Sequence, residues 1–257
     1  MYGIVANTFY MQELLIFKLF EGIPRQGPGS DLCTEKMFSL VPVIPNAPEI
    51  LDIGCGTGAQ TLTLARIARN ARVTAVDVYT PYLATLKKKA EENGLSNRIT
   101  TICASMDDLP LETGYFDIIW AEGSVFVMGF SEGIRYWKNL LKPGGYLALS
   151  EMVWFTDTPS YDTREFFREQ YPAMTTITGN TDMVNAAGYT LLSSFSFPAS
   201  VWWDNYYIPL EKRLDEFERM YTGNDEAMAL VEVLRKEIAL FRDHSTEYGY
   251  QFFLLKN

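Results

Sequence analysis

Short apolar runs alternate along the chain with segments whose apolar residues recur at helical spacing. The runs are rich in β-branched residues and end at glycine, proline or acidic residues, which is typical of buried parallel strands. Predicted strands cover residues 50–53, 72–76, 99–103, 116–121, 146–150, 189–197 and 248–255. Because strands and helices alternate, the pattern predicts an α/β fold with a doubly wound, mostly parallel seven-stranded sheet.

Two segments flank this core. Apolar residues at helical spacing from Phe9 to Phe20 predict an N-terminal helical lead-in, and a Pro/Gly-rich loop follows over residues 22–30. Before the last strand, Trp202 and Trp203 precede a helical insertion over residues 205–243, which is too long for a hairpin connection. We expect this insertion to cover the active site, to form a homodimer contact, or both.

The length of 257 residues is sufficient for one elaborated α/β domain. We expect a single domain over residues 1–257. It would comprise an N-terminal helical lid (residues 1–45), a cofactor-binding core (residues 46–151), and substrate-side elements with the insertion and the last strand (residues 152–257).

The first strand runs into a glycine-rich turn over residues 50–58, Ile-Leu-Asp-Ile-Gly-Cys-Gly-Thr-Gly. Glycine permits positive φ and lets a ligand lie directly on the main chain, so the turn predicts the floor of a nucleoside-cofactor site. Gly54, Gly56 and Ala59 also fit the dinucleotide pattern G-x-G-x-x-G/A. Asp52 favours a different ligand, because its carboxylate would repel a pyrophosphate and accept a cationic tail.

The segment resembles motif I of the class I, seven-strand S-adenosylmethionine (SAM) methyltransferases, of the small-molecule branch similar to the UbiE/methyltransferase-11 type. The Leu-Leu-Lys-Pro-Gly-Gly turn at residues 140–145 resembles a later landmark of that family. The resemblance covers residues 45 to 151 and implies an antiparallel last strand. It also implies that the glycine turn cradles the methionine part of SAM and that Asp52 supports its amino group, directly or through water.

Further cofactor contacts are expected after the second and third strands. Asp77 can accept both ribose hydroxyls, a feature that dinucleotide enzymes share. Ser105 stands where the family often has an acid for the adenine amino group, so Asp107, or Ser105 with the backbone at Met106, is expected there; Asp107 would alternatively cap the next turn. The expected SAM-binding set is Arg25, Gly27, Asp52, Gly54, Cys55, Gly56, Gly58, Asp77, Val78, Ser105, Met106, Asp107 and Glu122.

Two carboxylates are candidates for the catalytic positions. Glu122 follows the fourth strand at its carboxyl end, where ligands lie in open α/β sheets, and could contact the cofactor, orient an amine or act as a base. Glu151 ranks second, since it follows the fifth predicted strand in the same way. Either side chain could instead cap a helix or turn. Arg25 could reach the SAM carboxylate, or it could belong to a plain connecting loop.

The composition of the chain restricts the classes of molecule that it is expected to bind. Lys and Arg total 22 against 32 Asp and Glu, and the formal net charge of -10 disfavours nucleic acid and favours a small-molecule acceptor. The three cysteines form no pair motif, so neither a disulfide framework nor a metal site is expected. No apolar run reaches the roughly 18 residues of a membrane span, and no secretory leader is evident, so we expect a cytoplasmic protein.

Together these observations predict a SAM-dependent methyltransferase that transfers a methyl group to N, O or an activated carbon of a small molecule and releases S-adenosylhomocysteine (SAH). Two alternatives stay open. One is an NAD(P)-dependent oxidoreductase, which Asp52 and the expected antiparallel strand oppose. The other is a non-catalytic SAM-binding module on the same fold.

Overall fold

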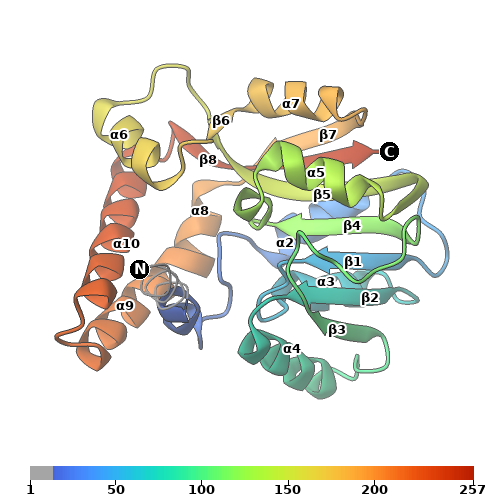
Figure 1. The fold of residues 1–257 in the computed structure, drawn as a ribbon, viewed down its shortest axis with the longest axis horizontal. Coiled ribbons are helices and arrows are strands. Elements are labelled where there is room, and N and C mark those ends of the chain that lie inside the picture. Colours follow the sequence, from blue (N-terminus) through green and yellow to red (C-terminus); the bar gives the residue numbers. More distant parts are fainter. Residues whose placement is uncertain (1–13) are drawn as a thin grey trace, which may run out of the picture.

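The computed structural model describes residues 14–257, which form an α/β fold around one mixed sheet (Figure 1). The strands lie in the order β3-β2-β1-β4-β5-β8-β7. Their bounds are β1 Glu49–Ile53, β2 Arg72–Asp77, β3 Ile99–Cys103, β4 Phe116–Glu122, β5 Leu141–Trp154, β7 Thr190–Ser196 and β8 Tyr248–Lys256. The α/β class predicted from the hydrophobic pattern is confirmed.

Strand β8 is antiparallel to both of its neighbours, β5 and β7, while β1 to β5 pair in parallel. This reproduces the antiparallel last strand that the family resemblance implies. The sheet differs from the seven-stranded expectation in one respect. A two-residue strand, β6 (Thr175–Thr176), pairs with the end of β5 and brings the described sheet to eight strands.

Helices cover both faces of the sheet. Apolar residues of α2 (Asp31–Ser39), α3 (Ala59–Ile67) and α4 (Thr80–Glu92) belong to one buried cluster, and those of α5 (Phe130–Lys138) and α7 (Ile177–Ala186) belong to the other. Tyr79 is the N-cap of α4, Asn93 is its C-cap, and Gly94 follows with φ 67°.

Strand β5 is longer than the sequence suggested. Its pairing with β4 is irregular, because Phe116 pairs with Leu141 whereas Ile118 pairs with Tyr146. The extra residues bulge out at the expected Lys-Pro-Gly-Gly turn, where Gly144 has φ 76°. At the other end β5 continues to Trp154, since it pairs with β8 along its whole later half. Glu151 therefore lies within a strand and not after one.

The insertion before β8 is helical. It contains α8 (Ala199–Trp202), a π-helical segment (Trp203–Tyr207), α9 (Ile208–Met220) and α10 (Asp225–His244), and α6 (Tyr161–Gln170) lies beside α10. In Figure 1 these helices stand together next to the carboxyl ends of the parallel strands. They face the edge at which α/β proteins bind their ligands.

Residues 14–20 are helical, and Leu15, Leu19 and Phe20 are buried against the core. The rest of the predicted lead-in, from Phe9 to residue 13, lies outside the described residues. Helix α9 holds this segment, because Arg213 donates hydrogen bonds to the carbonyl oxygens of Lys18 and Leu19, each at 2.9 Å. Within residues 14–257, no helix combines the length and hydropathy that crossing a membrane requires.

Candidate active site

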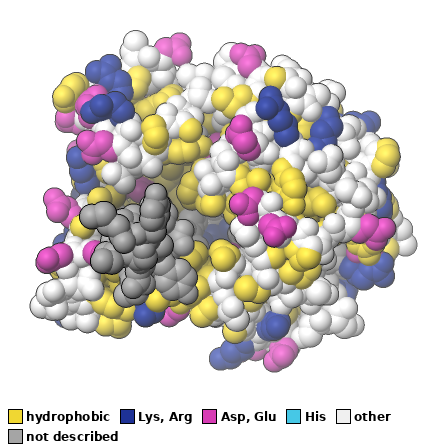
Figure 2. All heavy atoms as spheres, viewed as in Figure 1, with side chains coloured by type: hydrophobic (Ala, Val, Ile, Leu, Met, Phe, Trp, Pro, Cys, Tyr) yellow, Lys and Arg dark blue, Asp and Glu magenta, His cyan; other side chains and the backbone are white. Residues whose placement is uncertain are grey.

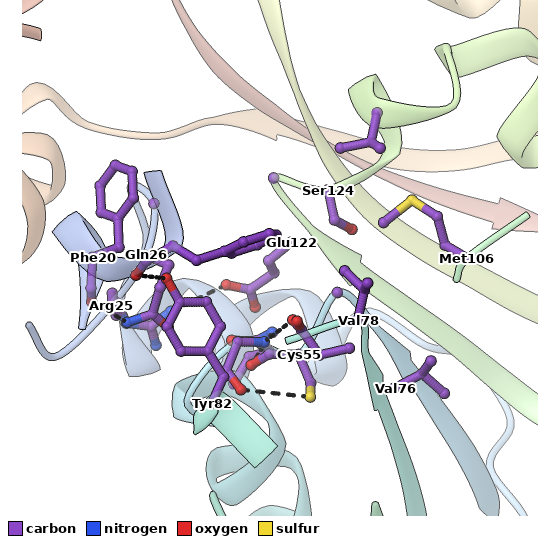
Figure 3. A pocket seen from close by; sticks show the side chains of 18 of the residues that line it. Phe20, Arg25, Gln26, Cys55, Val76, Val78, Tyr82, Met106, Glu122 and Ser124 are labelled. Atoms are coloured by element: carbon purple, nitrogen blue, oxygen red, sulfur yellow. Dashed lines mark hydrogen bonds and ion pairs between the residues drawn. The ribbon is translucent and has the colours of Figure 1, made fainter. Parts of the chain in front are cut away.

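A cavity of about 540 Å³ lies at the carboxyl ends of β1, β2 and β4, within the size range of small-molecule sites. Figure 2 shows hydrophobic side chains gathered around the hollow near the centre of this face. In the close-up of Figure 3, Phe20, Arg25 and Gln26 lie on one side of the cavity, and Val76 and Met106 lie on the other. The cavity therefore lies between the N-terminal segment and the strand ends.

The glycine-rich turn forms the floor of this cavity. Gly54, Gly56 and Gly58 all have positive φ, at 71°, 53° and 84°. A Cβ on Gly54 would lie 2.5 Å from the Cβ of Ser124, and one on Gly58 would lie 2.1 Å from a methyl group of Leu86. Both conformation and space thus require glycine, as the sequence predicted. Gly54, Cys55 and Gly56 line the cavity, whereas Gly58 lies behind it at the start of α3.

Asp77 lies at the end of β2 and lines the cavity beside Val78. Its Oδ2 accepts the Gly56 N–H at 2.9 Å, and its Oδ1 accepts the Tyr79 N–H at 2.9 Å. Burial raises the pKa of this carboxyl, although the two backbone donors partly offset the shift. The acid is thus fixed to the glycine turn and still lines the cavity.

Asp52 occupies a different position from the one expected. Its side chain is fully buried and does not line the cavity. Thr61 donates a hydrogen bond to it at 2.5 Å, and Gln60 donates another at 3.3 Å. Burial, which these donors only partly offset, raises the pKa of Asp52 to about 7. Asp52 therefore does not reach the cavity itself, whereas Gln60, which donates to it, lines the cavity.

The Pro/Gly-rich loop closes over the glycine turn. The side-chain oxygen of Gln26 accepts the Thr57 N–H at 2.8 Å, and its amide nitrogen donates to the Ile23 carbonyl at 3.1 Å. Arg25, Gln26 and Gly27 all line the cavity. The loop is thus part of the cavity wall and more than a plain connection.

Arg25 and Glu122 form a buried network above the strand ends. Arg25 donates to Glu122 at 3.2 Å and to Asp31 at 2.9 Å. Glu122 also accepts hydrogen bonds from Thr34 at 2.6 Å and from the Trp120 indole at 2.9 Å. Although both Arg25 and Glu122 line the cavity, each is already paired. This arrangement suits an orienting role for Glu122 better than proton abstraction, since its oxygen atoms already have donors.

Only some of the residues expected near the adenine line the cavity. Ser105 and Met106 line it, and the Trp137 indole fixes this loop by donating to the Met106 carbonyl at 3.1 Å. Asp107 is exposed and does not line the cavity. Of the two possibilities left open by the sequence, the geometry therefore favours Ser105 with the Met106 backbone.

Glu151 does not line the cavity either. It is 2% exposed, its Oε1 accepts the Met152 N–H at 2.7 Å, and its Oε2 has no partner in the described part of the chain. Burial raises its pKa to about 8, and the Met152 amide and Tyr171 only partly offset this shift. It is a buried carboxyl without a charge partner and not the strand-terminal acid that the sequence suggested.

Several cavity residues were not anticipated from the sequence. The aromatic wall and the polar contacts of neighbouring loops add Phe17, Phe20, Gln26, Gln60, Tyr82, Ser124, Phe126 and Val127. Gln26 stands in the Pro-Arg-Gln-Gly loop already suspected of covering the site, so its place in that loop was the one available signal. Within residues 14–257, no cluster of three or more histidine, cysteine or carboxylate side chains is arranged to hold a metal ion.

A positive-φ glycine turn at the carboxyl edge of a doubly wound sheet, with an acid after the second strand, defines a nucleoside-cofactor-binding α/β protein. Residues 50–145 match the family model described as a methyltransferase domain. Residues 50–145 are therefore assigned to a methyltransferase domain, for which SAM is the cofactor. The family resemblance drawn from the sequence is confirmed.

Similar proteins agree with this assignment. The chain is 30% identical over 121 residues to methyltransferase GfsG of Streptomyces halstedii, which covers 47% of this chain and 43% of that protein. The chain spans less than half the length of the curated relatives that it matches.

Solved structures extend the likeness to nearly the whole fold. A SAM-dependent methyltransferase from Geobacter sulfurreducens in complex with SAH has a TM-score of 0.79 at 18% identity, over 93% of this chain and 96% of that one. The [4+2]-cyclase SpnF has a TM-score of 0.71 at 22% identity, over 98% of this chain and 95% of that one. At these identities the likeness shows the fold alone.

Proposed function

We propose that this protein is an active SAM-dependent methyltransferase that methylates N, O or an activated carbon of a small-molecule acceptor. The observation that carries the proposal is the cavity of about 540 Å³ whose floor is the glycine turn and whose wall includes the Asp77 carboxylate. This combination suits a nucleoside with a charged amino-acid tail. A small acceptor is favoured because the net charge of -10 would repel polyanions.

The cavity residues fit the cofactor region by region. The backbone at Gly54 and Gly56 would lie against the methionine part, Asp77 would accept the ribose hydroxyls, and Ser105 with Met106 would border the adenine. Asp52 would act from behind by holding Gln60. When bound, SAM supplies a methyl group activated by its sulfonium charge.

The protein's own contribution is to align the acceptor and exclude water. Transfer needs a nucleophile in line with the carbon–sulfur bond, and a base only where that nucleophile carries a proton that must leave. Phe20, Tyr82 and Phe126 give the cavity an apolar wall that would exclude water. Glu122, held by Arg25, Thr34 and Trp120, would orient groups at the end of β4.

Two alternatives predict different results. An NAD(P)-dependent oxidoreductase is opposed by the antiparallel β8 and by the methyltransferase match. A non-catalytic SAM-binding module fits the same cofactor site, and the shared fold of a [4+2]-cyclase shows that this fold also occurs in a protein named for other chemistry. Only a measured transfer separates this last alternative from the proposed function.

Two measurements test the proposal. Isothermal titration calorimetry should show binding of SAM and SAH at micromolar concentrations and none of NADH. Incubation with methyl-labelled SAM and fractionated cell extract should then release SAH and label a low-molecular-weight product, identified by mass spectrometry. NADH binding without SAM binding would favour the oxidoreductase, and SAM binding without labelling of any fraction would favour the non-catalytic module.

A further inference from the structure

The helical segment over residues 14–20 supplies one wall of the cavity. Ile16, Phe17 and Phe20 of this segment line the cavity, and the chain then turns into the Pro/Gly-rich loop. The last four carbonyl groups of a helix have no partner within the helix and must be satisfied from outside it. The groups that hold these carbonyls therefore determine where the wall lies.

Arg213 of α9 holds two of the carbonyls. Its Nη2 donates to the Lys18 oxygen and its Nε donates to the Leu19 oxygen, each at 2.9 Å. The side chain is only 16% exposed, and the planar guanidinium fixes the direction of both hydrogen bonds. Its positive charge also lies at the negative end of the helix dipole. Arg213 thus caps the carboxyl end of a helix that lies 194 residues before it in the chain.

Residues of the cavity itself hold the two neighbouring carbonyls. The Tyr82 hydroxyl, from α4, donates to the Phe17 oxygen at 2.9 Å. The amide nitrogen of Gln26 reaches the Phe20 oxygen at 3.5 Å, while the Gln26 oxygen accepts the Thr57 N–H of the glycine turn. The wall is therefore held from the cofactor-binding core and from the insertion at the same time.

The Phe17 ring connects this wall to Asp77. It stacks on Tyr79, with ring centroids 4.7 Å apart and 8° between the ring planes, and it meets the edge of Tyr82 at 5.9 Å. The Tyr79 N–H in turn donates to Asp77 at 2.9 Å. A shift of residues 14–20 would therefore disturb the surroundings of the carboxylate that lines the cavity.

Helix α9 does not reach the cavity. Among residues 14–257, the residues that line the cavity all precede residue 128, whereas α9 belongs to the insertion before β8. In Figure 1, residues 14–20, in dark blue, lie between α9 and the parallel strands. Any effect of Arg213 on a bound cofactor must therefore act through residues 14–20.

We propose that Arg213 is a positioning residue for SAM: it holds the wall over residues 14–20 in place and thereby couples the insertion to cofactor binding. This inference rests on the proposed function, because it concerns the same cavity. Without Arg213 the wall would occupy its binding position in only a fraction of the molecules, and the apparent affinity would fall by that fraction. Coupling is reciprocal, so a bound cofactor should also make α9 more rigid.

SAH affinity of the full chain tests the proposal by titration calorimetry. The measurements are made below the unfolding transition of each variant, where a loss of stability alone leaves the affinity unchanged. Arg213→Met keeps an apolar stem and removes the donors, and we expect affinity to fall about tenfold. Arg213→Lys keeps a cationic donor and should bind SAH more tightly than Arg213→Met.

Arg235→Met is the matched control. Arg235 lies in the same insertion and pairs with Asp215 and Glu218 of α9 at exposed positions. Its loss removes an arginine from the α9–α10 pair without removing a cap from residues 14–20. We expect SAH affinity within about twofold of wild type, the small effect typical of exposed ion pairs.

Hydrogen exchange of the wild type provides a second measurement, which decides if Arg213→Met does not fold. SAH should slow amide exchange over residues 208–214 of α9 more than over α7, which packs against the opposite face of the sheet. Equal slowing in the two helices would overturn the coupling.

Three results of the affinity measurements would also overturn it: unchanged affinity in Arg213→Met, an equal loss in Arg235→Met, or no recovery in Arg213→Lys. All of these outcomes leave SAH binding by the wild type intact. They therefore differ from failure of the proposed function, in which the wild type would bind neither SAM nor SAH.

Discussion

The guanidinium of Arg25 lies 3.2 Å from the carboxylate of Glu122 and joins the N-terminal loop to the carboxyl end of β4. Both side chains are at least nine-tenths buried, at 9% and 4% exposed. Removing either member of such a buried pair should destabilise the fold, because the other member is left as a buried, uncompensated charge. The loop over the cavity is therefore attached to the site by electrostatics as well as by the Gln26 contact.

Replacing Arg25 tests this attachment. Arg25→Ala should lower the free energy of unfolding by about 2–4 kcal/mol, because it leaves the buried Glu122 carboxylate without its cationic partner. It should also weaken SAH binding. Denaturant unfolding and calorimetry give the two quantities. Arg66→Ala is the control, since Arg66 pairs with Asp31 at an exposed position and should cost less than about 1 kcal/mol. Equal losses in the two variants would contradict the attachment.

Replacing Asp77 should weaken SAM binding more than replacing Asp52. Asp77→Ala removes the carboxylate that faces the cavity, so we expect SAM affinity to fall by about 10- to 100-fold, the loss typical of a charge-assisted hydrogen bond. Asp52→Asn keeps an acceptor for Thr61 behind the wall and should cost less than about tenfold. Titration calorimetry of both variants measures the difference. A larger loss in Asp52→Asn would restore a direct contact for that acid.

Two turn glycines separate the cost of a steric collision from the cost of a positive φ. Gly58→Ala should destabilise the protein by about 3 kcal/mol or more, because positive φ is combined with a collision against Leu86. Gly144→Ala is the matched control: its φ is 76°, but nothing lies within 4 Å of the new Cβ, so strain of about 1–2 kcal/mol is the only cost. Chemical denaturation of both variants measures the gap, and similar values would show that the contact with Leu86 relaxes.

Stability should depend on pH through Glu151. Its pKa is raised from 4.5 to about 8 in the folded protein, so the folded state binds more protons than the unfolded state between these values and stability falls as pH rises through this window. Wild type should lose roughly 3 kcal/mol more than Glu151→Gln between pH 6 and pH 9. Parallel unfolding curves at both pH values test this, and equal losses would mean that Glu151 is already ionised at pH 6.

The sequence predicted most of what local rules determine. Strand ends, the glycine turn and Asp77 followed from hydrophobic pattern and spacing, because backbone sterics fix them over a few residues. The orientation of Asp52 did not follow, since it depends on Thr61 and Gln60 in the next helix. The position of Glu151 was missed for a similar reason: pairing with β8, a strand far along the chain, extends β5 past the predicted end.

The place of β8 in the sheet affects how the chain folds during synthesis. Among residues 14–257, strand β7 pairs with β8 alone, yet residues 197–247 separate these two strands along the chain. While a ribosome is making that stretch, β5 and β7 each present an open hydrogen-bonding edge, the kind of surface on which nascent chains aggregate. The sheet closes, and the buried face around Tyr250 forms, only after residues 248–256 have emerged.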